Sequence, residues 1–303
     1  MKLLFYYLIF PGCLFASFVG LMAGWVDRKV TARLQWRVGP PWHQNFTDLI
    51  KLLGKETIIP AGTGTIFLLA PYIGVLSAGL VSVLIGCSIV MPMQGVVGDV
   101  IVAMYLLVMP GVALLIGASA SRNPLASVGA SREMKLMIAY ELPFILNVIA
   151  MVIKSGGALQ LGYITTYQLN FGSNIWSVSG MLAFISMVFC MQAKLGVVPF
   201  DASEADQEIM GGVLIEYSGA ALALFKLAKA LMLYSVPMFL IVLFMGKDVS
   251  LLFVALKYVS LLVVIILIKN TNPRLRIDQA VKFFWRWPLW LAVGAVVLAV
   301  VGR

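Results

Sequence analysis

Long apolar runs separated by polar connections dominate this chain of 303 residues. A bilayer-spanning helix needs about 20 mostly apolar residues, and eight runs meet that length. They lie at about 3–26, 66–91, 98–118, 134–153, 178–198, 213–245, 249–268 and 283–301. The pattern predicts an all-α, polytopic membrane protein with about eight transmembrane helices, forming a single integral-membrane domain over residues 1–303.

The longest connection, residues 27–64, carries a different pattern. Within 45–56 an apolar face recurs at helical spacing, and the charged side chains lie off it. The apolar face consists of Phe46, Leu49, Ile50 and Leu53. This spacing predicts a cytoplasmic amphipathic helix that lies on the membrane or on a partner.

Basic residues set the expected orientation. The chain is 12% charged, against roughly 25% in soluble domains, and its net charge is +9. Lys and Arg gather after the first, third and seventh runs, whereas the alternate connections offer little beyond Lys154 and Lys247. By the positive-inside rule the odd-numbered loops are cytoplasmic, and both termini lie outside the cell membrane. Since the charge follows sidedness, a nucleic-acid role has no support.

The sequence offers no site for bond chemistry within this chain. Cys13, Cys87 and Cys190 are isolated within apolar runs, so the chain cannot hold an iron–sulfur cluster or a structural zinc unaided. His43 is the only histidine, and no glycine-rich phosphate loop occurs. We therefore expect no catalytic residue, no metal site and no cofactor in this chain alone.

One connection concentrates the acids. The acid loop (residues 198–219) holds five of the 13 acids: Asp201, Glu204, Asp206, Glu208 and Glu216. Crowded carboxylates at the edge of a low-dielectric slab repel one another, which raises their pKa values. On a helix, Asp201, Glu204 and Glu208 would share one face and Asp206 would point elsewhere. The alternative is an ordinary solvated loop.

Three of the ionisable residues within apolar runs are candidate functional residues. Glu141 precedes Pro143, which removes a backbone donor and favours a kink. Lys226 and Lys229 lie about 12 residues into the sixth run. A charge at membrane depth costs about 2.5–3.5 kcal/mol on insertion scales, so such residues normally face a polar interior. The lysines can instead snorkel to the interface, whereas the short Glu141 side chain favours a functional role.

These residues resemble a known family. The chain looks like the membrane subunit of respiratory complex I that borders the quinone chamber, and like its relatives in group 4 NiFe hydrogenases. The resemblance covers essentially the whole length. Its marks are Asp27-Arg-Lys-Val-x-Ala-Arg33, Arg37-Val-Gly-Pro40, Asp48-x-x-Lys51-Leu, Pro199-Phe-Asp-x-x-Glu-Ala-x-Gln-Glu208, Glu216-Tyr-Ser-Gly219 and Pro273-Arg-x-Arg-x-Asp-Gln279.

Two segments resemble the hydrogenase branch more than the quinone-reducing one. They are the loop from Asn123 to Glu133 and the segment from Asn270 to Asp278. The acid loop departs from the family pattern at Ala202-Ser203 and at Asp206, where the family usually has Glu. The shorter side chain puts the role of residue 206 in doubt.

The resemblance implies a non-catalytic subunit that links redox chemistry to transport. A soluble arm with iron–sulfur clusters and a NiFe-type large subunit would dock on the cytoplasmic side, beside antiporter-like and small membrane subunits in the lipid bilayer. The residues that this implies for docking are Arg28, Arg33, Arg37, Arg122, Arg132, Arg274 and Arg276. Those for coupling and the ion path are Glu141, Asp201, Glu204, Asp206, Glu208, Glu216, Lys226 and Lys229. We further predict that the acid loop pairs with Arg28, Arg33 and Arg37.

Three functions stay open at this point. The leading one is a membrane-bound hydrogenase, or a sulfur-reducing relative, that moves H⁺ or Na⁺. The second is the quinone-site subunit of a proton-pumping NADH:quinone oxidoreductase. The third is a stand-alone secondary transporter, which the lack of a detectable inverted repeat disfavours.

Overall fold

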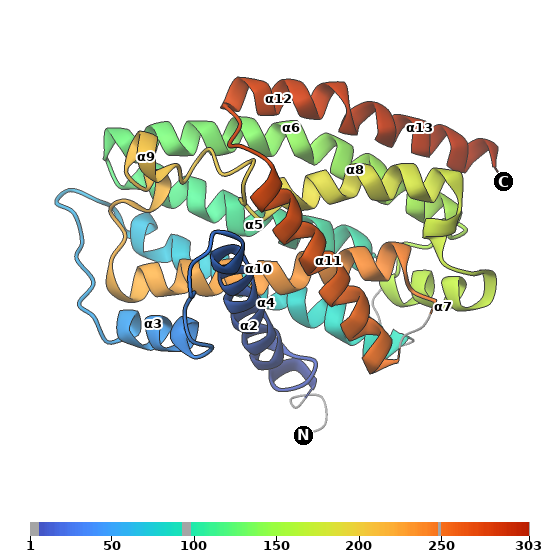
Figure 1. Cartoon of the computed structure of the whole chain (residues 1–303), viewed down its shortest axis with the longest axis horizontal. Helices are drawn as coiled ribbons and strands as arrows, with labels where there is room; N and C mark the ends of the chain where they lie inside the picture. Colours follow the sequence, from blue (N-terminus) through green and yellow to red (C-terminus); the bar gives the residue numbers. More distant parts are fainter. Residues whose placement is uncertain (1–5, 93–97, 248–249, 303) are drawn as a thin grey trace.

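The computed structural model describes residues 6–92, 98–247 and 250–302, and of Asp206 and Gln207 it describes only the backbone. Every regular element in these ranges is a helix, which confirms the all-α class (Figure 1). In chain order the helices are α2 (Cys13–Leu34), α3 (Gln44–Leu53), α4 (Thr65–Val90), α5 (Asp99–Ala120), α6 (Pro124–Lys154), α7 (Leu161–Phe171), η2 (Asn174–Trp176), α8 (Val178–Lys194), α9 (Asp206–Ile209), η3 (Gly212–Leu214), α10 (Gly219–Phe244), α11 (Leu251–Thr271), α12 (Ile277–Arg286) and α13 (Pro288–Val301).

Each of the eight predicted runs contains a helix. In the described residues seven helices are long and apolar enough to cross a membrane: Tyr6–Leu34, Thr65–Val90, Asp99–Ala120, Pro124–Lys154, Gly219–Phe244, Leu251–Thr271 and Ile277–Val301. The remaining run forms α8, which is apolar but has 17 residues. α8 ends early because Gly196 adopts a positive φ of 59° and Pro199 follows shortly after. The multi-pass membrane class is confirmed.

Helix α10 is the most deeply buried of the spans. It packs against α4, α2, α3 and α11. Figure 1 shows α4, α5, α6, α8 and α10 running along the long axis, while α2 and α11 cross them obliquely. Large side chains such as Phe144, Phe239 and Phe244 are fully buried and fill the space between these helices. The protein has one large core around α10 and two smaller buried clusters, one around Phe67 and Tyr217 and one around Ala126 and Val213.

Two helices lie where no separate element was predicted. α12 is amphipathic and breaks from α13 at Trp287–Pro288, so the last predicted run is two helices joined end to end. The proline begins α13 because the first helical position needs no amide donor. α7 is a short helix between α6 and α8. The predicted amphipathic helix is present as α3 and coincides with residues 45–53 of the expected range.

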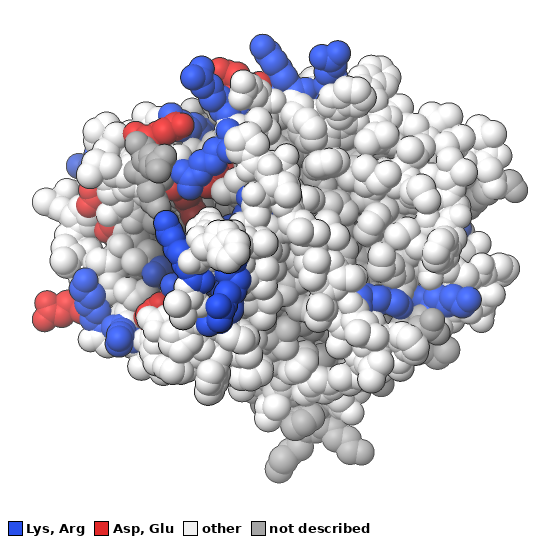
Figure 2. Space-filling model, in the orientation of Figure 1, with Lys and Arg blue, Asp and Glu red and all other residues white. Residues whose placement is uncertain are grey.

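Charged side chains gather at one end of the helix bundle. In Figure 2 they cluster on the left and upper left, over α3, α9 and α12, whereas the right half of this face shows only scattered Lys or Arg side chains. We name the crowded part the acid-loop end and the other part the far end. α6 joins the two, because Glu133 lies near the acid loop and Lys154 is its last residue.

Candidate functional site

The acid loop is mostly irregular. After α8 the chain passes through turns and bends from 197 to 205, forms the four-residue α9, and reaches α10 through η3. The prediction that Asp201, Glu204 and Glu208 share one helical face is therefore wrong, because the residues from 201 to 205 are not helical. The side chain of Asp206 lies outside the described part of the structure.

Ion pairs tie the acid loop to three separate segments. Three of its carboxylates each meet a cation from a different element, which holds the irregular chain against the ends of the helices. The pairs are Asp201 with Arg274 at 3.0 Å, Glu204 with Lys229 at 2.6 Å, and Glu208 with Arg132 at 2.5 Å. Glu216 accepts a hydrogen bond of 2.5 Å from Nδ2 of Asn123, so the loop preceding α6 is held as well.

The predicted pairing of the acid loop with Arg28, Arg33 and Arg37 is wrong for its described side chains. Arg28 instead lies 3.6 Å from Asp48 and donates to Asn45, while neither Arg33 nor Arg37 forms an ion pair with a described residue. The reason is geometric. α2 continues unbroken through residues 28 and 33 and carries them toward α3. The cations from α6, α10 and the α11–α12 connection lie closer to the acids.

The outer rim of the acid loop forms a polar groove of about 300 Å³. Its walls carry three acids and three arginines: Arg132, Asp201, Glu208, Arg274, Arg276 and Asp278. Burial raises the pKa of the Asp201 carboxyl, and the neighbouring Arg274 guanidinium partly offsets that rise. Arg122, from the same predicted docking set, lies apart, beside Gly62.

A chamber of about 100 Å³, lined mostly by apolar side chains but also by several ionisable ones, lies directly beneath the acid loop. It is bounded by α5, α6, the end of α8 and α10. The ionisable side chains that line it are Glu133, Lys194, Glu204, Lys226 and Lys229, and the Tyr140 ring lines it too. Glu133 is 8% exposed and forms a hydrogen bond with Ser203. The structure therefore brings together both predicted lysines and one predicted loop acid.

Glu141 forms an ion pair at the edge of this chamber. Its carboxylate lies 3.0 Å from Nζ of Lys194, and the Lys194 side chain is only 1% exposed. The ammonium also lies over the rings of Phe144 and Tyr140, at 4.1 and 5.4 Å from their centres. An ammonium shielded from water in this way depends on the carboxylate and the ring faces for its stabilisation.

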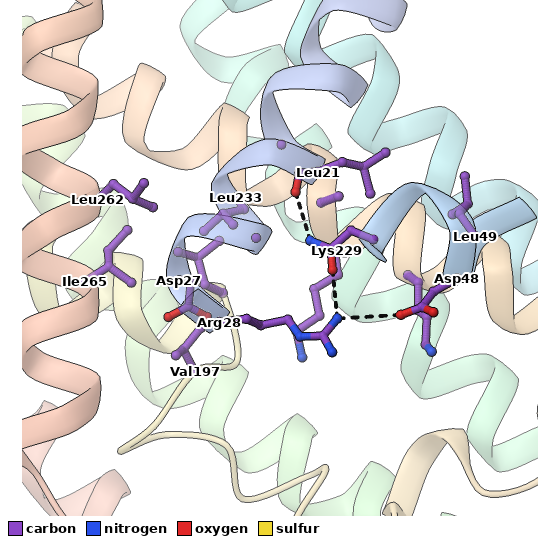
Figure 3. Close-up of a pocket in the computed structure, with 16 residues that line it drawn as sticks. Leu21, Asp27, Arg28, Asp48, Leu49, Val197, Lys229, Leu233, Leu262 and Ile265 are labelled. Atoms are coloured by element: carbon purple, nitrogen blue, oxygen red, sulfur yellow. Dashed lines mark hydrogen bonds and ion pairs between the residues drawn. The ribbon is translucent and has the colours of Figure 1, made fainter. Parts of the chain in front are cut away.

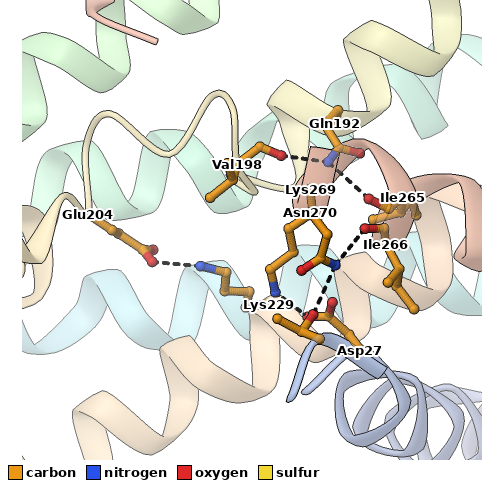
Figure 4. Close-up of polar contacts among 10 residues, drawn as sticks. Asp27, Gln192, Val198, Glu204, Lys229, Ile265, Ile266, Lys269 and Asn270 are labelled. Atoms are coloured by element: carbon orange, nitrogen blue, oxygen red, sulfur yellow. Dashed lines mark hydrogen bonds and ion pairs between the residues drawn. The ribbon is translucent and has the colours of Figure 1, made fainter. Parts of the chain in front are cut away.

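A second cavity, of about 290 Å³, lies on the other side of Lys226 and Lys229 between α2, α3, α10 and α11. Figure 3 shows Arg28 in its polar part, bonded toward Asp48, with leucine and isoleucine side chains around it. At its edge the Asp27 carboxylate lies 2.7 Å from Nζ of Lys269 (Figure 4). Figure 4 also shows Lys229 reaching Glu204, so the α10 lysines separate the two cavities.

Sequence reasoning missed four participants. They place buried or partly buried charges beside the two cavities, and they are Glu133, Lys194, Asp27 and Lys269, the last two as an ion pair. Lys194 had a visible signal, since it lies within the apolar run at 178–198. Its pairing with Glu141 left no signal in the sequence, because 53 residues separate the two. Among the described residues no group of three or more His, Cys, Asp or Glu side chains could hold a metal ion.

Comparisons with known proteins agree with this arrangement. The sequence profile of a family described as NADH dehydrogenase matches residues 7–300. The chain belongs to this family. It is 32% identical over 294 residues to the H subunit of NADH-quinone oxidoreductase from Bacillus cytotoxicus, covering 90% of this chain and 86% of the relative. It is 29% identical over 293 residues to the corresponding protein of Geobacillus thermodenitrificans, with coverages of 91% and 87%.

One solved structure is similar over its full length. It belongs to the membrane-bound sulfane sulfur reductase, an archaeal respiratory membrane complex, with a TM-score of 0.89 and 28% identity. The match covers 99% of this chain and 100% of that one. The chain is therefore a multi-pass membrane subunit of a multisubunit respiratory complex, of the complex I and hydrogenase type.

Proposed function

We propose that this chain docks a soluble redox arm on its acid-loop end, on the cytoplasmic side, and couples electron transfer there to ion translocation. One observation carries the proposal. The Glu204–Lys229 pair joins the acid loop at the surface to the chamber that Glu133, Lys194 and Lys226 also line. A charge change or displacement at the loop therefore acts directly on ionisable groups beneath it. No bond chemistry by this chain is needed.

The coupling rests on electrostatics at short range. Glu204 and Lys229 are 2.6 Å apart and line a chamber about 100 Å³ in volume, together with three further ionisable side chains. Movement of Glu204 by a few ångströms would leave Lys229 to interact with Glu133 and would change the protonation preference of the whole group. One unit of pKa corresponds to about 1.4 kcal/mol, so modest displacements are enough to move a proton.

The complex is proposed to be a membrane-bound hydrogenase or its sulfur-reducing relative, with iron–sulfur clusters and, in the hydrogenase case, a NiFe-type centre in partner subunits. The full-length match to the sulfane sulfur reductase chain supports this branch, because the NADH-quinone oxidoreductase relatives extend beyond the aligned region by about an eighth of their length. The loop from Asn123 to Glu133 supports it as well.

A quinone reductase is the second candidate, and the cavity beside α3 favours it. That cavity combines charged groups with an apolar wall formed by Leu21, Leu49, Leu233, Leu262 and Ile265, a combination suited to a lipid-soluble ring compound. The 32% identity to a membrane subunit of NADH-quinone oxidoreductase points the same way.

Purification of the intact complex through a tag on this chain tests the proposal. We expect soluble iron–sulfur proteins and antiporter-like membrane subunits to copurify. If the complex contains nickel and evolves hydrogen, it belongs to the hydrogenase branch. If it reduces a sulfur compound and contains no nickel, it is the sulfur-reducing relative. If it reduces a lipid quinone, it is a quinone reductase. A chain that purifies alone and carries ions in liposomes would overturn the proposal in favour of a transporter.

A further inference from the structure

Polar side chains recur every seven residues along one face of α6. They are Glu133, Tyr140, Asn147 and Lys154. Seven residues make almost two turns, so the four lie in one stripe. The stripe extends over 21 residues, or about 31 Å at about 1.5 Å per residue, and a bilayer's hydrocarbon core is about 30 Å thick. Glu133, Tyr140 and Asn147 are 8%, 3% and 0% exposed, so the stripe faces protein rather than lipid.

Helix α8 packs against α6 and supplies a matching polar face (Figure 1). Steps of four and seven residues place that face along the contact: Ser179, Ser186, Cys190 and Lys194. Three polar contacts link α6 to α8 and to η2, the short helix before it. Lys194 pairs with Glu141, the neighbour of Tyr140 on α6, and Nδ2 of Asn147 donates to Oγ of Ser186 at 2.8 Å midway. At the far end Nζ of Lys154 donates to the carbonyl of Asn174 in η2 at 3.2 Å.

The middle contact carries an unused acceptor. Oδ1 of Asn147 is buried and accepts no hydrogen bond from a described residue, while the Ser186 hydroxyl donates to the carbonyl of Pro288 at 2.8 Å. A purely structural link between α6 and α8 needs only the hydrogen bond that Nδ2 of Asn147 donates to Ser186. A buried unpaired carbonyl is destabilising, and such groups are normally satisfied by ordered water. Asn147 is therefore placed to hold water at mid-membrane.

We propose that the α6–α8 seam is a proton path that crosses the membrane within this chain. The proposal rests on the coupling function above and extends it by naming the ion and the route. A proton enters from the chamber at Glu133, passes the Lys194–Glu141 pair, moves along water held by Asn147 and Ser186, and leaves at Lys154. No covalent bond other than those to the proton changes.

The composition of the seam favours H⁺ over Na⁺. At mid-membrane it offers a neutral amide and a hydroxyl, which order water but do not replace the oxygen shell of a dehydrated metal cation. Between Asn147 and Lys154, a distance of about 10 Å along the helix, Met151 and Ala183 are fully buried. These apolar side chains fill the step, so the proposed path requires its transient hydration, and we expect Met151, with its flexible side chain, to move aside.

The test uses the whole complex in liposomes, driven by its own electron donor and acceptor. A pH-sensitive dye and a sodium-sensitive dye report ions moved per electron transferred. Asn147→Leu keeps the size of the side chain but cannot hold water, so we expect it to lower the proton-to-electron ratio. Ser186→Ala should do the same, and Asn147→Ser, which stays polar, should retain a higher ratio than Asn147→Leu. The matched control is Ser82→Ala, which removes a fully buried serine hydroxyl that bonds only within α4.

The outcomes separate the two proposals. If the unaltered complex turns over without moving any ion, the coupling function itself fails. If it moves protons and the assembled Asn147→Leu and Ser186→Ala complexes keep its ratio, the seam is only a structural clamp and this inference fails alone. Primary sodium movement without protons also overturns it. Where a core variant does not assemble, Lys154→Gln replaces it as the test, since that side chain lies at the end of α6. We expect Lys154→Gln to lower the proton-to-electron ratio, and an unchanged ratio would overturn the inference.

Discussion

The Lys194 ammonium lies 3.0 Å from the Glu141 carboxylate in a part of the bundle where the lysine is 1% and the glutamate 20% exposed. The pair joins the end of α8 to the middle of α6. Each charge is held in an apolar environment by the other, so removal of one strands its partner. This arrangement gives Glu141 a structural role, which can be separated by experiment from its proposed role in transport.

Glu141→Gln should reduce ion translocation strongly and should also destabilise the complex, because it leaves the Lys194 charge buried and unpaired. Such a loss typically costs about 3–5 kcal/mol. The double variant Glu141→Gln with Lys194→Met removes both charges and should recover most of the thermal stability without recovering translocation. Thermal unfolding of the purified complex and dye-monitored ion uptake measure the two effects. A normal ion gradient with Glu141→Gln would leave the residue with a structural role alone.

The Glu204–Lys229 pair is expected to matter for coupling far more than for stability. Both side chains are partly exposed, at 29% and 47%, and such pairs contribute about 0–1 kcal/mol. Glu204→Gln and Lys229→Met should each lower ions moved per electron, and the double variant should lose less than the sum of the two single losses. Strictly additive losses would show that the residues do not act as one unit.

A control for this cycle is available in the same loop. Glu208 is 59% exposed and pairs with Arg132 at the rim, away from the chamber. Glu208→Gln should weaken retention of the soluble arm, especially at high salt, while the complexes that remain intact stay coupled. Equal uncoupling by Glu208→Gln and Glu204→Gln would contradict a specific role for the chamber.

Asp201 should give the complex a recognisable pH dependence. Burial raises the pKa of its folded-state carboxyl, so the folded protein holds the proton more tightly than the unfolded chain. The protonated Asp201 carboxyl therefore stabilises the folded protein. This contribution is fully present below the ordinary Asp pKa of about 3.9 and is lost as pH rises through the raised pKa of the folded state. Asp201→Asn should flatten that decline in the thermal midpoint over the acid range. Arg274→Gln should raise the pKa of Asp201 further and move the decline to higher pH, and no difference among the three proteins would contradict the assignment.

Residues 204 and 154 should be accessible from opposite sides of the membrane. α6 connects the chamber that Glu204 lines to its own last residue, Lys154, across about 31 Å of helix from Glu133. With the native cysteines replaced by serine, single cysteines at the two positions should react with an impermeant thiol reagent in vesicles of opposite orientation. We expect position 204 on the cytoplasmic side. Labelling of both from the same side would contradict the topology.

The sequence alone determined the membrane class and the approximate position of each span among the described residues, because the bilayer forces long apolar runs into helices whatever their neighbours are. It also placed α3, since the apolar spacing of residues 46 to 53 is a local property. The concentration of acids between two spans marked the acid loop in the same way. These features depend on composition and periodicity, which are properties of short windows of chain.

Only the tertiary structure decided which charges meet. Glu204 reaches Lys229, Asp201 reaches Arg274 and Glu141 reaches Lys194, whereas the expected arginines of α2 lie elsewhere. The end of α8 at Lys194 and the irregular course of the acid loop set these partners, and both depend on how α6, α8 and α10 pack. Ion pairs form over about 4 Å between segments tens of residues apart, so a local pattern carries no information about them. The heptad of polar residues on α6 was visible in the sequence, but its burial against α8 was decided by packing.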